Sequence, residues 1–325
     1  MLTQTEAANL LGVAPEWIRE RLSHWRAASE GAGAGASESG CPFPFMQQLL
    51  QERQARYQRV IATVGVQKGG VGKSFLAVNL AVCLAREGCR TLLIDLDPQA
   101  CSTYLLAPEN VDSAAGKTVL EACIEPSGSL KACIMPSAYE GLDLAPCRET
   151  ARQLHRVSSP GDPAGFFSAR LAELTEYDCI LFDVPPAFSD IVVGAYLASA
   201  LVLMPALSDV WSLEAVDFTL TDLRRECERW HRKLPECRVV LNRFSGNRNA
   251  SMAARGDLLE RHPELLSPVT IRDTAAVPNA LNLGISIFRM SGVAPLRAEV
   301  TALARSVCPL VTDAAPAQQP AQAGL

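Results

Sequence analysis

The sequence predicts an α/β protein with a mostly parallel, doubly wound sheet and a small all-α region before it. Short apolar runs alternate with helical stretches from residue 60 onward, a pattern typical of parallel strands joined by helices. A glycine-rich turn separates the first of these runs from the first helical stretch. The chain has 325 residues, 48% of them hydrophobic, which is enough for one large core and a small appendage.

Residues 1–30 predict a separate helix-turn-helix-like region. Thr3 and Glu6 have the spacing of a capping box, Gly12 ends the first helix, and Pro15 begins the second. A DNA-reading helix pair and a helical hairpin for dimer contacts both fit, because acidic residues offset the basic ones here. We favour DNA reading.

The next segments connect and terminate the main domain. Residues 31–58 begin with a flexible Gly/Ala/Ser stretch and continue as a predicted polar helix over Phe45–Tyr57. The main, nucleotide-binding domain is predicted over 59–312. Residues 313–325 form an Ala/Pro/Gln tail that is expected to be disordered. The sequence has no long apolar run and no leader pattern, which predicts a soluble, cytoplasmic protein.

Seven strands are expected inside the domain. They are Val60–Val66, Thr91–Leu96, Asp143–Ala145, Cys179–Val184, Leu201–Met204, Val239–Leu241 and Val269–Ile271. Helical stretches such as Phe75–Arg86, Phe166–Leu174 and Leu213–Trp230 lie between several of them. Ligands of such sheets bind at the carboxyl ends of the strands, and the motifs below fall at those ends.

The glycine-rich turn ends in Gly72, Lys73 and Ser74, directly before a helix. Backbone N–H groups of such a turn, with the positive end of a helix, hold phosphate. Lys73 would reach the β- and γ-phosphates, and the Ser74 hydroxyl would hold Mg²⁺. A second lysine, Lys68, precedes the glycines, and one nucleotide in one subunit does not explain it. The predicted ATP-binding set is Lys68, Gly69, Gly70, Val71, Gly72, Lys73, Ser74 and Phe75, with Asn242 added below.

Polar side chains follow three further strands. Asp95 and Asp97 come after one apolar run, and Asp183 comes after another. Hydrolysis of ATP needs a group that orients water, although Asp97 would also cap the next helix. Asn242 ends a later strand, where adenine binding and turn formation are comparable alternatives. The Asn-Lys-x-Asp signature of guanine specificity is absent, so ATP is preferred.

Charge is unevenly distributed along the chain. The formal net charge is −5, yet residues 224–261 hold ten Arg or Lys against five Asp or Glu. Alternating charges suggest that 224–233 is a solvated helix face. Further along, Arg243, Arg248 and Arg255 lie among Ser and Asn residues. We expect these arginines to bind DNA phosphates without reading bases.

Four segments together resemble the ParA/MinD family of ATPases with a deviant Walker A loop. They are Lys-Gly-Gly-Val-Gly-Lys-Ser at 68–74, Asp-Leu-Asp-Pro-Gln at 95–99, Asp-Val-Pro-Pro at 183–186, and the closing segment 270–287. The resemblance implies that Lys68 crosses to the ATP of a partner in an ATP-dependent homodimer. It also implies that Asp97 orients the attacking water, that Asp95 and Asp183 join Ser74 around Mg²⁺, and that Arg272 helps to bind DNA. The implied catalytic residues are Lys68, Lys73 and Asp97.

The resemblance implies a DNA partition (segregation) ATPase with weak Mg²⁺-dependent hydrolysis. Its dimer would bind nucleoid DNA non-specifically, and a centromere-binding partner protein would stimulate hydrolysis. Residues 5–19 also resemble the N-terminal region of the larger plasmid-type ParA proteins, and MerR-like and excisionase helix pairs. An alternative is therefore a nucleotide-switched repressor of its own operon. A MinD-like membrane ATPase is rejected because residues 314–325 contain no Lys or Arg.

Overall fold

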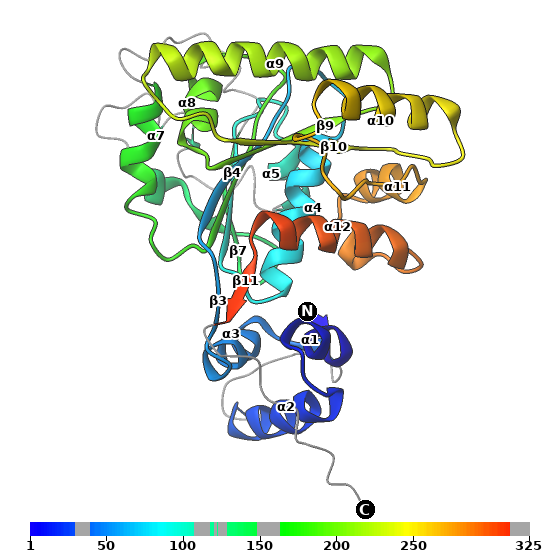
Figure 1. Ribbon diagram of the computed structural model, residues 1–325. Coiled ribbons are helices and arrows are strands. Elements are labelled where there is room, and N and C mark those ends of the chain that lie inside the picture. The colour runs from blue at the N-terminus through cyan, green and yellow to red at the C-terminus, as the bar shows by residue number, and fades with distance from the viewer. Residues whose placement is uncertain (30–39, 107–117, 120–121, 123–128, 148–162, 313–325) are drawn as a thin grey trace, which may run out of the picture.

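A seven-stranded sheet forms the centre of the computed structural model, with the order β10-β9-β4-β8-β5-β7-β6 (Figure 1). All neighbouring strands are parallel except β6, which runs antiparallel to β7. The structure describes residues 1–29, 40–106, 118–119, 122, 129–147 and 163–312. In sheet order the strands are Glu236–Leu241, Leu201–Ala206, Val60–Val64, Cys179–Asp183, Thr91–Asp95, Leu142–Ala145 and Met135–Pro136.

Helices cover both faces of the sheet, as the apolar runs predict. Leu93 and Leu181 belong to a core shared with α4 (Lys73–Arg86), α5 (Cys101–Leu106) and α12 (Ala294–Val307). Neighbouring residues Leu92 and Ile180 face the opposite core, because successive side chains of a strand alternate. That second core contains residues of α7 (Pro163–Leu171), α8 (Asp190–Ala198), α9 (Val210–Arg229) and α10 (Asn249–Arg261). The doubly wound prediction is confirmed.

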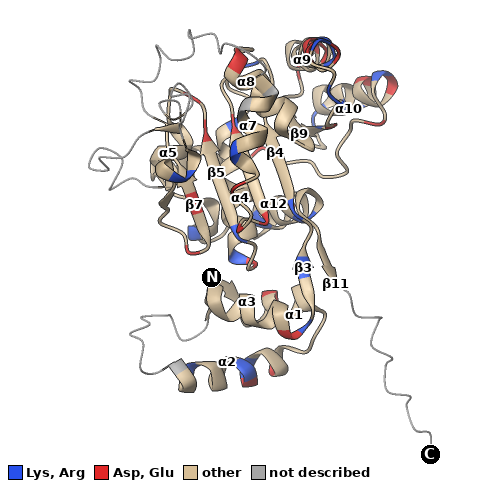
Figure 2. Cartoon of the chain, turned by 90° about the vertical axis from the view of Figure 1, so that its left-hand side faces the viewer, with Lys and Arg blue, Asp and Glu red and all other residues tan. Residues whose placement is uncertain are grey.

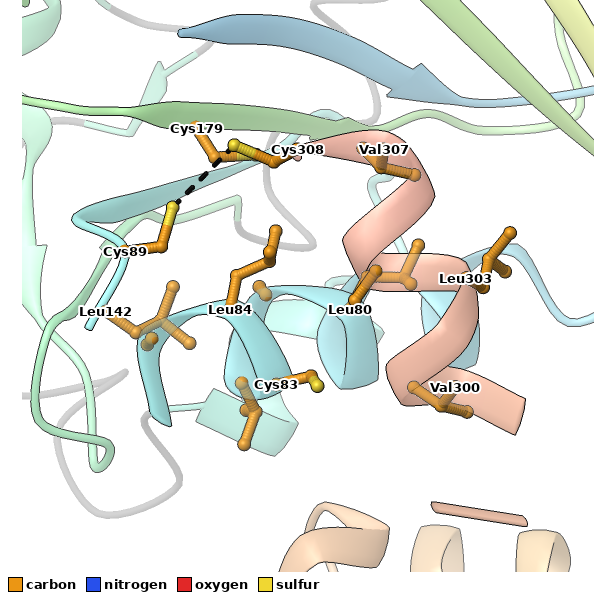
Figure 3. Packing of buried hydrophobic residues seen from close by; sticks show 14 of the residues in the cluster. Leu80, Cys83, Leu84, Cys89, Leu142, Cys179, Val300, Leu303, Val307 and Cys308 are labelled. Carbon is orange, nitrogen blue, oxygen red and sulfur yellow. Dashed lines mark hydrogen bonds between the residues drawn. The ribbon is translucent and has the colours of Figure 1, made fainter. Parts of the chain in front are cut away.

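The first core places α12 directly against α4 (Figure 3). Leu80 of α4 lies toward Leu303 of α12, and Leu84 lies toward the cysteines near the end of α12. Beside them the thiols of Cys89, Cys179 and Cys308 converge, and the Cys89 and Cys308 Sγ atoms are 3.9 Å apart (Figure 3). These three thiols are buried and form no disulfide. Buried free cysteines behave as small apolar side chains, so they contribute to the packing of this core.

The N-terminal residues form a helical unit below the sheet, next to the C-terminal end of α4 (Figures 1 and 2). It contains α1 (Gln4–Leu11), α2 (Pro15–Ser29) and α3 (Phe43–Glu52), with β1 (Leu2–Thr3) paired to β2 (Gly40–Cys41). The capping box of Thr3 and Glu6 is present, and Gly12 ends α1 with a φ of 63°. Arg86 at the end of α4 donates to the Met1 carbonyl at 2.9 Å and lies 3.4 Å from Glu6.

Several elements differ from the sequence prediction. The helix expected over Phe45–Tyr57 spans Phe43–Glu52, and Ala55–Tyr57 form a strand, β3, that pairs with β11 (Leu310–Thr312). This pairing joins segments from opposite ends of the chain, so no local pattern shows it. The expected strand Val269–Ile271 makes no ladder; two single bridges, Val239 with Leu266 and Phe244 with Arg272, lie around it. The antiparallel edge strand β6 was not expected.

The remaining described elements are short helices: η1 (Leu130–Cys133), α11 (Ala276–Asn282) and η3 (Ile287–Arg289). Within the described ranges, none of the helices combines the length and apolar character that a membrane crossing requires. The predicted linker at 31–39 and the predicted tail at 313–325 lie outside the described residues.

Candidate functional site

The predicted motifs meet at one edge of the sheet. Asp95 and Asp183 are register partners at the last positions of β5 and β8. Strand β4 pairs with β8 on the other side and leads into the glycine-rich loop, which opens onto α4. Because the strands are parallel, their carboxyl ends place these chain-distant residues together.

The loop has the backbone conformation that its glycines permit. Gly70 and Gly72 have φ angles of 75° and 94°, in the left-handed region that other residues rarely adopt. Gly72 is the N-cap of α4. A Cβ atom at Gly70 would meet nothing within 4 Å, whereas one at Gly72 would lie 2.3 Å from Asn242 Nδ2. The loop is therefore open on one side and closely backed by Asn242 on the other.

Lys73 lies inside this loop. Its side chain is 6% exposed, and Nζ donates to the Lys68 carbonyl at 2.6 Å. Burial lowers the pKa of Lys73, while the charges of Asp183 and Asp97 oppose that shift. A buried cation above the N-terminus of a helix is suited to a phosphate chain, which would satisfy both the charge and the N–H groups.

Asp183 is the best candidate to hold a metal ion. It is fully buried; Oδ2 accepts from Ser102 Oγ at 2.6 Å, Ser74 also donates to the carboxylate, and Oδ1 has no partner. Burial raises the pKa of Asp183 to about 6. A buried acceptor without a partner needs a cation or water, and an oxygen ligand beside the Ser74 hydroxyl fits Mg²⁺.

Asp95 faces the polypeptide on both of its oxygens. Oδ2 accepts from the Thr103 backbone at 2.9 Å and hydroxyl at 2.7 Å, and Oδ1 accepts from the Asp97 N–H at 2.9 Å. Burial and the neighbouring Asp183 raise the pKa of Asp95. In this geometry Asp95 fixes the turn that carries Asp97 and the start of α5. Ser102 and Thr103 were missed by sequence reasoning, although they lie shortly after the Asp-x-Asp segment, at the start of α5.

Asp97 lies in the turn after β5, is half-buried, and accepts from the Gln99 N–H at 2.9 Å. Its charge acts on Lys73, which places it beside the loop. A carboxylate held at this position, with part of its surface open, is able to orient a water molecule.

Lys68 is paired with an acid outside its own loop. Its Nζ lies 2.8 Å from Oδ1 of Asp209, the N-cap residue of α9. The residue before it, Gln67, is also tied to α9, since its N–H donates to Thr219 Oγ1 at 3.0 Å and its Nε2 to Asp222 Oδ2 at 2.8 Å. Asp209 was not identified from the sequence, because no motif marks it.

Asn242 braces the loop with its amide nitrogen, and its amide oxygen is bonded to the next residue. Nδ2 donates to the Val71 carbonyl at 2.7 Å, and Oδ1 accepts from the Arg243 N–H at 2.9 Å. The residue is 5% exposed. Phe75, another predicted nucleotide contact, has its side chain in the core with α12. The geometry thus gives Asn242 a bracing function beside the adenine contact predicted for it.

The predicted DNA-binding arginines are exposed but paired with acids. Arg243 and Arg248 both contact Asp273, at 3.2 and 2.8 Å, and Arg272 contacts Glu299 at 2.6 Å. The Arg255 side chain is exposed on α10. The structure brings Arg243, Arg248 and Arg272 together around Asp273 and the Phe244–Arg272 bridge, although their charges are partly neutralised.

Comparisons with known proteins identify the family of the chain. A family model described as an AAA domain (AAA_31) matches residues 58–234. The cell division protein PomZ of Myxococcus xanthus is 28% identical over 254 residues, covering 77% of this chain and 79% of PomZ. Protein IncC of Escherichia coli is 25% identical over 287 residues, covering 86% of this chain and 77% of IncC. The chromosome-partitioning ATPase Soj of Thermus thermophilus is 27% identical over 253 residues, covering 76% and 95%.

Solved structures share the architecture. The ATP complex of a substituted McdA from Cyanothece superposes with a TM-score of 0.67 at 22% identity, covering 78% of this chain and 97% of that one. A putative plasmid partition protein of Borrelia burgdorferi, bound to AMPPNP, gives 0.62 at 22% identity, covering 75% and 98%. At this identity the two structures show the fold alone.

Proposed function

This chain belongs to the AAA domain family, among its ParA-type ATPases, and on that premise we propose that it is an ATP-dependent DNA partition ATPase. In this proposal ATP with Mg²⁺ joins two copies, the dimer binds nucleoid DNA non-specifically, and a partner protein at a centromere-like site stimulates hydrolysis. The relatives named for chromosome partitioning and cell division support this class of function. The protein would then be cytoplasmic and associated with the nucleoid.

The presence of two lysines on one loop carries the proposal. Lys73 is buried within the loop, where it would bind the β- and γ-phosphates of its own subunit. Lys68 is paired with Asp209, at the start of α9, instead. A cation that is not bound within its own loop is available to a nucleotide held by a second copy, which supports pairing through ATP.

In the same proposal, the described residues would supply the parts that hydrolysis requires. The loop N–H groups and Lys73 would hold the phosphates, and Ser74 and Asp183 would hold Mg²⁺, directly or through water. The metal ion neutralises charge on the phosphate oxygens. Asp97, steadied by Asp95, would orient the attacking water, and Lys68 of the other copy would stabilise charge on the terminal phosphate. Hydrolysis without the partner protein is expected to be weak.

DNA binding under different nucleotides tests the proposal. We expect retention on non-specific duplex DNA with ATP or a slowly hydrolysed analogue, and release with ADP. Lys68→Gln should abolish retention because the dimer is lost, and Arg272→Ala should abolish it because phosphate contacts are lost. Lys233→Ala removes an exposed charge from the connection between α9 and β10 and serves as the matched control. Equal retention with ADP would refute the nucleotide dependence.

A second candidate function is operator binding by the N-terminal unit. Helix α2 buries Ile18 and Leu22, and leaves Arg19, Ser23 and His24 exposed together with the acidic Glu16 and Glu20. In this proposal Arg19 and His24 are the side chains that would contact DNA. A footprint on the region upstream of its own operon, lost in the Arg19→Ala/His24→Ala variant, would support this activity; protection that survives both substitutions would count against it.

A further inference from the structure

The contact between Lys68 and Asp209 joins two parts of the chain that no sequence motif connects. The residues are 141 positions apart, and Nζ lies 2.8 Å from Oδ1. The side chains are 25% and 40% exposed. Such a pair borders solvent and is therefore able to open at modest cost.

Asp209 is held in place independently of Lys68. As the N-cap of α9 it accepts from the Ser212 N–H at 2.9 Å and from the Ser212 hydroxyl at 2.8 Å. These bonds fix the carboxylate at the positive end of the helix. Asp209 is consequently unable to follow Lys68 when the lysine moves.

The backbone at Lys68 is also held. Gln67 is bonded to Thr219 and Asp222 on α9, and the Lys68 N–H donates to the Val66 carbonyl at 2.8 Å. With both ends anchored, rotation of the Lys68 side chain is the movement that remains. Immediately after Asp209, Val210 and Trp211 are 56% and 69% exposed, so an apolar surface adjoins the pair. Exposed large apolar side chains of this kind mark contact surfaces.

We propose that Asp209 is a positioning residue that holds Lys68 within the single chain, so that two copies pair only when each Lys68 exchanges Asp209 for phosphates held by the other copy. This inference rests on the proposed ATP-dependent dimer and identifies Asp209 as the group that opposes dimer formation. The terminal phosphate of ATP offers more negative charge than one carboxylate and so competes for Lys68. ADP lacks that phosphate, and Lys68 then stays on Asp209.

Asp209 affects the dimer dissociation constant through both copies. Each copy in a symmetric dimer gives up one Lys68–Asp209 contact, and a half-exposed ion pair shifts an equilibrium by a few-fold. Asp209→Asn should therefore tighten the dimer dissociation constant by about 5- to 30-fold, or ~1–2 kcal/mol. Asn caps a helix as well as Asp does, so α9 should remain intact.

Sedimentation of the full chain with Mg²⁺ and a slowly hydrolysed ATP analogue, and separately with ADP, measures this constant. Asp209→Asn should pair more tightly than wild type with the analogue, and begin to pair with ADP at high protein concentration. Ser212→Ala weakens the cap without touching Lys68 and should change the constant by no more than about twofold. Unchanged or weaker pairing of Asp209→Asn would overturn the inference.

A second measurement separates this inference from the proposed function. A double-mutant cycle of Lys68→Gln and Asp209→Asn, read by urea unfolding of the single chain with ADP, should show a coupling of about two- to fivefold in the unfolding equilibrium. Absence of coupling would refute the hold on Lys68. A wild-type chain that stays single with the ATP analogue would instead refute the proposed dimer, while the cycle would still report the contact.

Discussion

Replacing Gly72 with Ala should destabilise the phosphate loop by two mechanisms that can be separated. The backbone at Gly72 has a φ of 94° and a ψ of 26°, and this left-handed conformation costs a residue with a Cβ atom about 1–2 kcal/mol. The new Cβ would also lie 2.3 Å from Asn242 Nδ2. Displacing that amide breaks its 2.7 Å bond to the Val71 carbonyl, which costs a further ~1–3 kcal/mol because the groups are buried.

A double-mutant cycle with Asn242→Ala isolates the second mechanism. Asn242→Ala alone should lower the free energy of unfolding by ~1–3 kcal/mol, since it removes the same bond. Gly72→Ala should lower it by ~2–5 kcal/mol, the sum of both effects. In the double variant the clash has disappeared, so the two losses should overlap by ~1–3 kcal/mol. Urea unfolding of the chain without nucleotide measures each value.

Additive losses in this cycle, within ~0.5 kcal/mol, would show that Gly72 and Asn242 act independently and would refute the bracing argument. The same Asn242→Ala variant distinguishes bracing from adenine binding. Because both polar atoms of Asn242 are used by the loop and by Arg243, ATP and GTP affinities should fall by the same factor. A selective loss of ATP affinity would assign Asn242 to the base.

Three further predictions concern other parts of the molecule. Burial raises the pKa of the Glu87 carboxyl above its ordinary 4.5, despite the ion pair with Arg305. The folded chain therefore binds the carboxyl proton more tightly than the unfolded chain does. The free energy of unfolding should fall as the pH rises above 4.5. Glu87→Gln should flatten this dependence in urea unfolding between about pH 4 and 7, and an unchanged slope would contradict the assignment. Cys101 is exposed beside Asp97, whereas Cys89, Cys179 and Cys308 are buried; peptide mapping after brief maleimide treatment should find Cys101 labelled far ahead of these three, and equal labelling would refute the packing. Glu299→Gln releases Arg272 from its 2.6 Å ion pair, so the affinity for non-specific DNA in the presence of ATP should rise. The slope of log affinity against log salt concentration should steepen by about one unit. An unchanged affinity would show that Arg272 does not contact DNA.

The strand and loop chemistry was readable from the chain alone. The five residues of β8 are all buried, and the four apolar residues before Asp183 form a short continuous run that indicates a strand covered on both faces. Spacing placed Lys73 and Ser74 at the start of α4, because a glycine turn between a strand and a helix permits few geometries. Parallel strands then required Asp95 and Asp183 to meet at one edge.

The sequence also predicted some functional residues without the residues that pair with them. Arg243, Arg248 and Arg272 were correctly expected at the surface, but Asp273 and Glu299, which pair with them, carry no signal in the local pattern. Asp183 was likewise predicted without its partner Ser102, whose hydroxyl donates to it from 81 positions earlier in the chain. Charge counts along a segment do not report which acids fold against it.

Local spacing and apolar periodicity therefore determined the α/β class, the phosphate loop and the edge of the sheet where it lies. The tertiary structure decided what holds that loop: Asn242 behind Gly72, 171 residues from the Val71 carbonyl it binds, and Asp209 opposite Lys68, 141 residues away. Periodicity records which face of an element is buried, whereas these contacts depend on how separate elements are packed side by side. Only the packed chain brings the turns after β9 and β10 against the loop after β4.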